Sequence, residues 1–186
     1  MSKLPQNTIA TGNNCADGID GALSTFIGQA EVLDSLSLLV IGDLSYLYDL
    51  NAAIHDFKNN TRVLLINNFA GGEFHFNIGK KKISTLEQHI AAGHHTKIQD
   101  AIGLSNFQYI AVHNKGELEE KLSLFLRESE NPILMEVFTN PELDGSSLKK
   151  LIRNNIKMTP ERLIAGFVNK FLDCRTKYAI KKFLHR

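Results

Sequence analysis

Two short apolar runs with a helical segment between them constrain the fold of this chain most strongly. Leu36–Ile41 and Val63–Ile66 are almost entirely aliphatic, and the residues between them suit a helix. Such an arrangement is typical of neighbouring strands in a parallel sheet that is covered on both faces. The sequence therefore predicts an α/β fold, a three-layer α/β/α domain with a mainly parallel central sheet.

Polar residues follow both predicted strands. Gly42-Asp43 comes after the first strand, and Asn67-Asn68 comes after the second. Ligands of parallel sheets gather just beyond the carboxyl ends of the strands. A carboxylate and amide oxygens are suitable ligands for Mg2+, so the pair Asp43 and Asn68 indicates a cation site. Taken alone, Asp43 is equally well explained as a helix N-cap.

The rest of the chain continues the alternation of helices and strands. A Gly-rich segment, Gly12–Ala30, turns into a helical pattern before the first strand. The later predicted elements are helices at Thr85–Ala92, Thr96–Leu104 and Lys115–Arg127, strands at Phe107–Val112 and Ile133–Phe138, and closing helices at Ser146–Ile156 and Pro160–Leu184. We expect two domains, an α/β domain over residues 1–140 and a basic helical C-terminal extension over residues 141–186.

Composition narrows the classes of protein. The 186 residues suffice for one full core with an appendage. The chain has no long apolar span and no signal peptide, which predicts no transmembrane segment. Two cysteines, Cys15 and Cys174, are too few for a disulfide framework and favour a reducing cytoplasm.

Charge is distributed unevenly along the chain. Residues 141–186 contain eleven Lys or Arg and four Asp or Glu, a net charge of +7, which leaves −6 for the remainder. A solvated helical face explains this tail better than contact with a partner domain or an anionic surface. Without a motif that reads bases, basic charge does not predict nucleic-acid binding.

Three further features bear on chemistry. The Gly-rich turn before residue 22 could cradle a phosphate or a heterocycle, although many such turns are only turns. Free backbone N–H groups near Asp43 and Ser45-Tyr46 would attract a diphosphate. His94-His95 is interpreted as a pair of surface or loop-packing residues, since adjacent residues do not share a helix face and no HExxH pattern is present.

Three segments together resemble a known family. GNNCADGIDGALSTFIG, IGDLSYLYDLNA and INNFAGG are similar to the C-terminal, pyrophosphate-binding domain of thiamine-diphosphate-dependent enzymes. Within that superfamily they most resemble the menaquinone-pathway synthases that make succinyl-enolpyruvyl-hydroxycyclohexene carboxylate. The resemblance covers about residues 12–140.

The resemblance implies thiamine diphosphate and Mg2+ as cofactors and assigns a role to each matching residue. The metal ligands would be the side chains of Asp43 and Asn68 and the carbonyl of Ala70. Ile19 would be the apolar wedge that bends the cofactor. The other cofactor-binding positions would be Asp17, Gly18, Gly42, Leu44 and Ser45.

Three differences between this chain and the family bear on which reaction the enzyme would catalyse. Asn14 stands where those synthases have an Arg that holds substrate carboxylates, the turn NNFAGGEFHF differs from NNNGG, and residues 141–186 extend beyond the synthases' end. In the family, the activating Glu comes from a separate pyrimidine-binding domain, and no Glu of this chain is assigned that role. Leu4-Pro5 close behind Met1-Ser2 favours a chain cut from a longer enzyme; one subunit of a two-chain enzyme is the alternative.

We therefore expect the cofactor-binding domain or subunit of a decarboxylase or carboligase that acts on a 2-oxo acid. The full enzyme would be a homo-oligomer that includes a pyrimidine-binding domain. Its pathway could be menaquinone synthesis or another, such as that of surface-polysaccharide precursors. The alternatives are a non-catalytic module that keeps the fold and an unrelated nucleotide-binding α/β domain. If apolar tail residues such as Phe167 and Phe171 normally pack on a missing domain, the chain should self-associate.

Overall fold

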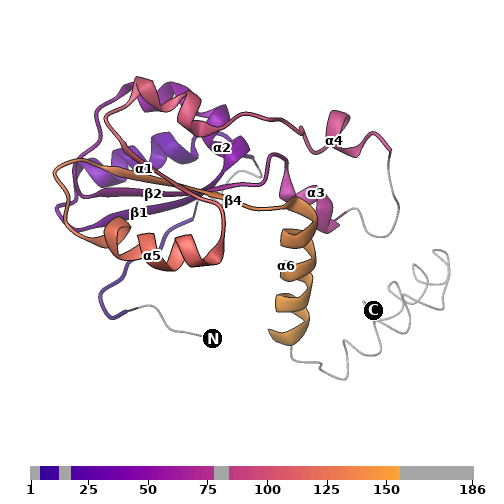
Figure 1. Ribbon diagram of the computed structural model, residues 1–186. Helices are drawn as coiled ribbons and strands as arrows, with labels where there is room; N and C mark the ends of the chain where they lie inside the picture. The colour runs from indigo at the N-terminus through magenta and orange to yellow at the C-terminus, as the bar shows by residue number, and fades with distance from the viewer. Residues whose placement is uncertain (1–4, 13–17, 78–83, 156–186) are drawn as a thin grey trace, which may run out of the picture. The chain divides into compact units, whose positions relative to one another are not determined.

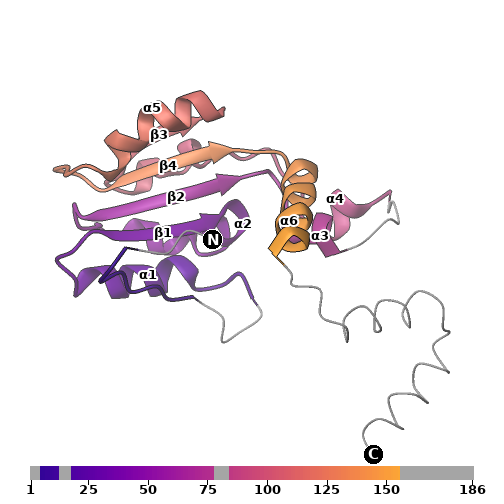
Figure 2. The ribbon, with the colours of Figure 1, turned by 90° about the horizontal axis from the view of Figure 1, so that it is seen from below.

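Four parallel strands form the central sheet of the protein. The computed structural model describes residues 5–12, 18–77 and 84–155. The strands lie side by side in the order β1-β2-β4-β3, and each neighbouring pair is parallel (Figure 2). Their bounds are β1 Ser37–Gly42, β2 Thr61–Asn67, β3 Gln108–Val112 and β4 Ile133–Phe138. All four predicted strands are confirmed, and β4 has the predicted bounds.

Helices cover both faces of the sheet, so the predicted three-layer α/β/α fold is confirmed (Figure 1). One core lies between the sheet and the α1 side and includes Leu23, Tyr46 and Leu65. A second, smaller core lies under α5 and includes Phe125 and Met135. The helices are α1 Ala22–Glu31, α2 Asp43–Tyr48, η1 Leu50–Ile54, α3 Gly72–Asn77, α4 Leu86–His89, η2 Ile98–Asp100, η3 Ile102–Leu104, α5 Lys115–Leu126 and α6 Pro141–Asn155.

Local hydrogen bonds explain where two of these helices are fixed. The Asn114 side chain caps α5 by accepting from the backbone N–H of Glu117 at 3.0 Å, and the Glu117 carboxylate accepts from the backbone N–H of His113 at 3.0 Å. This is a reciprocal capping arrangement that satisfies two free N–H groups. Asp49 accepts from both the backbone N–H and the hydroxyl of Ser24, each at 2.7 Å, and so ties the segment after α2 to α1.

The segment between β2 and β3 contains less helix than the sequence predicts. The helix expected at Thr85–Ala92 is reduced to α4, and the one expected at Thr96–Leu104 is two short 3-10 turns, η2 and η3. Ala92 has a φ of 49°, a left-handed conformation that ends the helical path. Residues 93–97 have no regular secondary structure, and His94 lies against the turn that follows β2, where its backbone N–H donates to the carbonyl of Phe69 at 2.9 Å.

The last described helix starts earlier than predicted. α6 begins at Pro141, in the favourable first helical position, and not at Ser146. The chain divides into two compact units, residues 1–147 and 148–186. Within the second unit, residues 148–155 are helical and exposed. The helix predicted at Pro160–Leu184 lies outside the described residues. No helix in the described part is long and apolar enough to cross a membrane.

One part of the sheet carries exposed apolar side chains. Leu39 and Ile41 of β1 pack on the α1 side, whereas Leu38 and Val40 alternate to the other face. There α5 packs over β3 and β4, as Figure 2 shows. Consequently Leu38 and Val40 remain 48% and 62% exposed at the edge strand.

Candidate functional site

The candidate site lies where β1 and β2 end. Gly42 pairs in register with Ile66, so Asp43 and Asn67 follow at the same level of the sheet. Asp43 is the first residue of α2 and is only 3% exposed. Its Oδ1 accepts a hydrogen bond from the backbone N–H of Leu44 at 2.7 Å. Among the described residues, its Oδ2 has no hydrogen-bond partner.

A histidine from a distant loop faces the free oxygen of Asp43. The Nε2 atom of His94 lies 3.3 Å from Asp43 Oδ2 and, within the described part of the chain, also lacks a hydrogen-bond partner. The His94 ring contacts the ring of Phe69 edge-on, with centroids 5.8 Å apart. His94 therefore connects the end of β1 with the turn that follows β2.

Burial dominates the electrostatics of Asp43. Desolvation raises the pKa of its carboxyl group above the usual range. The backbone N–H groups of Leu44 and Phe69 and the imidazole of His94 act against this rise, since each favours the charged carboxylate. A buried carboxylate gains further from a cation, because a positive charge offsets the cost of desolvation.

The turn after β2 presents the second predicted ligand. Asn68 Oδ1 accepts from the backbone N–H of Ala70 at 3.2 Å, and Asn68 Nδ2 donates to Asp144 Oδ2 at 3.1 Å. Phe69, which lies between Asn68 and Ala70, has a φ of 62°, in the left-handed region. The carbonyl oxygen of an amide has two acceptor positions, so Asn68 Oδ1 keeps capacity for a further partner.

A buried polar network connects the start of this turn to β4. Glu136 of β4 is fully buried, and its Oε1 accepts from Asn67 Nδ2 at 2.7 Å and from the backbone N–H of Ile98 at 3.0 Å. The Tyr109 hydroxyl donates to its other oxygen. Asn67 Oδ1 in turn accepts from the backbone N–H of Phe69 at 3.0 Å. The network joins β2, β4 and the start of the turn into one rigid unit.

The other predicted cofactor-binding residues separate into two groups. Gly42, Leu44 and Ser45 adjoin Asp43, and a Cβ added to Gly42 would meet no atom within 4 Å, so its main chain is open to a ligand. Ala70 follows Asn68 and is 3% exposed. Gly18 and Ile19 lie before α1, where Ile19 is 45% exposed. No contact described for this chain joins these two residues to Asp43. Asp17 lies outside the described residues.

The donor set fits a hard cation. One carboxylate, one amide oxygen and one backbone carbonyl are all oxygen donors of the kind that Mg2+ selects. Within the described part of the chain no cluster of three or more His, Cys, Asp or Glu could hold a metal, so a zinc-like centre has no support there. The buried Oδ2 of Asp43, which faces the His94 ring at 3.3 Å and makes no hydrogen bond of full geometry among the described residues, makes the fit specific.

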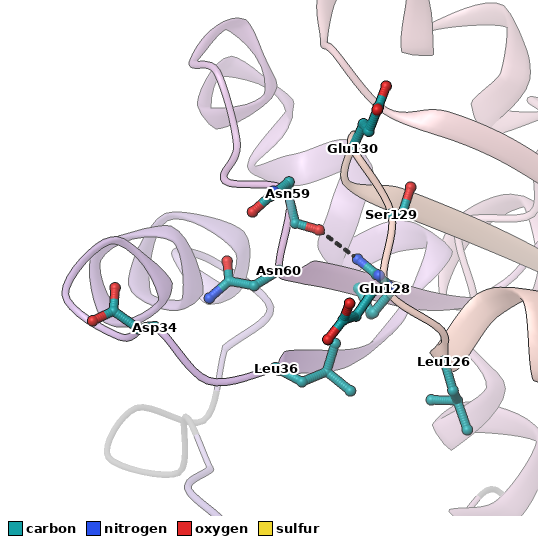
Figure 3. A pocket seen from close by; sticks show the side chains of 9 residues that line it. Asp34, Leu36, Asn59, Asn60, Leu126, Glu128, Ser129 and Glu130 are labelled. Carbon is teal, nitrogen blue, oxygen red and sulfur yellow. Dashed lines mark hydrogen bonds between the residues drawn. The ribbon is translucent and has the colours of Figure 1, made fainter.

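A separate pocket lies at the opposite end of the sheet (Figure 3). Its volume is about 570 Å³, and it is lined by residues that precede the strands, such as Leu36 and Asn60. Beside it the buried guanidinium of Arg62 donates to the backbone carbonyl of Asn59 at 2.8 Å. None of the predicted site residues lines this pocket. Its position before the strands distinguishes it from the candidate site, which follows them.

Two residues at the site were not predicted for it. His94 belongs to a pair that the sequence suggests is a surface or loop-packing pair, and the structure places the neighbouring His95 in the exposed class. Asp144 belongs to the first turn of α6 and carries no sequence signal. A contact over 76 residues cannot be found from local spacing, and neither can the approach of His94 to Asp43, which precedes it by 51 residues.

Comparisons with known proteins identify close relatives. A 2-succinyl-5-enolpyruvyl-6-hydroxy-3-cyclohexene-1-carboxylate synthase of Bacteroides thetaiotaomicron is 37% identical over 152 residues, which are 80% of this chain and 27% of that protein. The synthase of Phocaeicola vulgatus is 38% identical over 141 residues, 74% of this chain and 25% of that protein. The one from Christiangramia forsetii is 31% identical over 137 residues, 73% and 24% respectively. No protein-family model matches the chain.

These relatives confirm the resemblance that was drawn from three short motifs. The chain matches about a quarter of the length of each of these synthases, so it corresponds to one part of such a protein. The match to the Bacteroides thetaiotaomicron synthase covers 80% of this chain and must therefore include both strand ends, wherever it begins.

Proposed function

We propose that this chain, a relative of one part of the 2-succinyl-5-enolpyruvyl-6-hydroxy-3-cyclohexene-1-carboxylate synthases, binds thiamine diphosphate and Mg2+. It would be the cofactor-holding part of a decarboxylase or carboligase that acts on a 2-oxo acid. The observation that carries the proposal is Asp43. Its buried carboxylate follows the last residue of β1, and its Oδ2 faces His94 Nε2 at 3.3 Å without a hydrogen bond of full geometry in the described structure.

Each residue at the strand ends has a role in this proposal. Asp43, Asn68 and the carbonyl of Ala70 would hold the cation, which neutralises the charge of the diphosphate. The open main chain at Gly42, with Leu44 and Ser45, would meet the diphosphate itself. Asp17, Gly18 and Ile19 would address the aminopyrimidine and thiazolium rings. When bound, thiamine diphosphate supplies the nucleophilic carbon that reacts with the 2-oxo acid.

A second domain would complete the active site. We infer that the activating Glu comes from a pyrimidine-binding domain or subunit, and that the complete enzyme is a cytoplasmic homo-oligomer. The chain's match to about a quarter of its relatives supports the need for further domains. The part represented here would therefore bind the cofactor without turning over substrate.

The substrate follows less directly than the cofactor. The relatives favour the synthase reaction that their names describe. Asn14 replaces the Arg expected to hold substrate carboxylates, which favours a different acceptor. A pathway for surface-polysaccharide precursors remains a prediction to which the comparisons add nothing. A non-catalytic module that merely keeps the fold is disfavoured by the retention of both proposed ligands, Asp43 and Asn68.

Thermal unfolding with and without ligands tests the proposal. A ligand that binds only the folded chain raises its stability, by about 2.7 kcal/mol at a hundredfold excess over the dissociation constant. We expect this rise with Mg2+ and thiamine diphosphate together and not with either alone. The Asp43→Ala variant should remain folded and lose the combined effect.

Nucleotides provide the control for an unrelated function. Mg2+ with ADP offers a similar diphosphate but no aminopyrimidine or thiazolium ring. Equal protection by Mg2+-ADP would favour a nucleotide-binding domain, and protection that persists in Asp43→Ala would refute the ligand assignment. No protection by thiamine diphosphate would refute cofactor binding by this chain.

A further inference from the structure

The pairing of His94 with Asp43 supports an inference about how the cation site is built. His94 Nε2 and Asp43 Oδ2 lie 3.3 Å apart, and neither atom has another hydrogen-bond partner in the described residues. The two side chains are only 15% and 4% exposed. Two buried polar atoms that face each other without other partners are best explained by an interaction between them.

The backbone determines which nitrogen of His94 carries the proton. The backbone N–H of Thr96 donates to His94 Nδ1 at 3.1 Å, so Nδ1 is an acceptor. In a neutral imidazole the other nitrogen then carries the hydrogen. Nε2, which lies 3.3 Å from Asp43 Oδ2, then carries the hydrogen and has no lone pair to offer a metal. This makes His94 a donor to the carboxylate and excludes it as a ligand in this tautomer.

The position of the ring is itself fixed from two directions. The backbone N–H of His94 donates to the carbonyl of Phe69 at 2.9 Å, and the ring contacts the Phe69 side chain. Phe69 lies between Asn68 and Ala70, the two proposed ligands on the second strand end. A shift of the turn would thus move His94, and with it the donor that faces Asp43.

We propose that His94 is a positioning residue of the cation site, which donates from Nε2 to Asp43 Oδ2 and holds the carboxylate in its ligating orientation. The inference rests on the proposed function for the assignment of Asp43 as a ligand. Groups that orient metal ligands typically change metal affinity by about 10-fold to 100-fold when they are removed. No sequence motif marks His94, and its neighbour His95 is exposed.

Substitutions at residue 94 separate donation from packing. His94→Leu removes the donor and retains apolar bulk, and His94→Asn keeps an amide that is too short to reach Asp43. His94→Gln places an amide N–H at about the position of Nε2. His95→Leu is the matched control, since it changes the exposed neighbour by the same chemistry.

The measurement is the dissociation constant of Mg2+ for the full chain. Mg2+ is titrated calorimetrically into the chain at saturating thiamine diphosphate. The pH is about 8, where an imidazole is ordinarily neutral. We expect about tenfold weaker Mg2+ binding for His94→Leu and His94→Asn. His94→Gln should recover most of the affinity, and His95→Leu should leave it unchanged. Ligand-free unfolding midpoints identify any variant that fails to fold.

The outcomes distinguish this inference from the proposed function. Mg2+ affinity that is unchanged or increased in His94→Leu and His94→Asn would overturn the role of His94 while cofactor binding stands. Equal losses in His94→Gln and His94→Leu would assign His94 to packing and also overturn it. If the unsubstituted chain binds no Mg2+ with thiamine diphosphate, the proposed function and the inference fail together.

Discussion

Asn68 and Asp144 form a hydrogen bond across 76 residues of sequence, with 3.1 Å between Asn68 Nδ2 and Asp144 Oδ2. The same Asp144 oxygen accepts from the hydroxyl of Thr139 at 2.7 Å. Because an acidic acceptor selects the NH2 end of the Asn68 amide, its Oδ1 must point the other way. The first turn of α6 thus determines which end of Asn68 is offered to a cation.

Loss of Asp144 should therefore weaken metal binding. In Asp144→Ala the NH2 group of Asn68 loses its acceptor and the amide is held through Oδ1 alone, so we expect about tenfold weaker Mg2+ binding in the presence of thiamine diphosphate. Asp144→Asn is the matched control, since its Oδ1 can still accept from both Asn68 and Thr139. Calorimetric titration compares them, and equal affinity of Asp144→Ala and the unsubstituted chain would contradict the role.

Tyr46 should limit stability in alkaline solution. Burial, with the charge of Glu136, raises the pKa of Tyr46 to about 12 from its ordinary 10.0. The folded state holds the proton more tightly than the unfolded state, so this stabilisation is complete below pH 10.0 and is lost as the pH rises through about 12. Between about pH 9 and pH 11, the free energy of unfolding should fall by about 1 kcal/mol less in Tyr46→Phe than in the unsubstituted chain.

Urea unfolding at several pH values measures this effect. At neutral pH the substitution should cost little, since the buried Tyr46 hydroxyl has no hydrogen-bond partner among the described residues. Tyr48→Phe is the control, because Tyr48 is 68% exposed. Identical alkaline profiles for the two variants would show that burial of Tyr46 does not control the profile.

Replacement of Glu136 by its amide counterpart, Gln, should lower the free energy of unfolding. Both of its oxygens accept hydrogen bonds from Asn67, Ile98 and Tyr109, and Gln offers one acceptor and one donor in their place. With the amide oxygen in the place of Oε1, the NH2 group faces the Tyr109 hydroxyl, which must then accept and lose its own acceptor, at a cost of about 2 kcal/mol in the free energy of unfolding. The exposed substitution Glu119→Gln should change it by less than about 0.5 kcal/mol. Chemical unfolding tests both, and a loss below about 1 kcal/mol for Glu136→Gln would contradict the expectation.

The exposed apolar side chains of β1 should promote self-association of the chain. Edge strands with apolar surface readily pair with other chains, and a lysine on the strand prevents this. We expect Val40→Lys to lower the average mass in sedimentation without loss of folding stability, since Val40 is 62% exposed. Ile54→Lys, at a site 64% exposed in η1, should have no effect. A monomeric unsubstituted chain would refute the prediction.

The sequence predicted those parts of the fold that depend on local pattern. Apolar runs such as Ile133–Phe138 read directly as strands, and Asp43 and Asn68 were placed at adjacent strand ends because parallel strands finish at one edge. Helix lengths between β2 and β3 were wrong because backbone conformation at Ala92, and not helix propensity, decides where the chain turns. The position of His94, two residues later, depends on the same backbone conformation at Ala92.

Local sequence pattern did not predict the residues whose side chains orient other residues. Asp144 acts on Asn68 only after β4 has brought the start of α6 beside the turn. The roles of Asp43, Asn68 and the other proposed cofactor-binding residues remain predictions from the family resemblance. The domain boundary at residue 140 also remains a prediction.

The start of α6 has a practical consequence for truncation of the gene. A fragment that stops at residue 140 would omit Asp144, and the NH2 group of its Asn68 amide would lose this hydrogen bond. A fragment that stops at residue 147, where the first compact unit ends, would keep the first turn of α6 and the hydrogen bond. Two expression products that differ by seven codons should therefore differ in the cation site, although both include every proposed ligand.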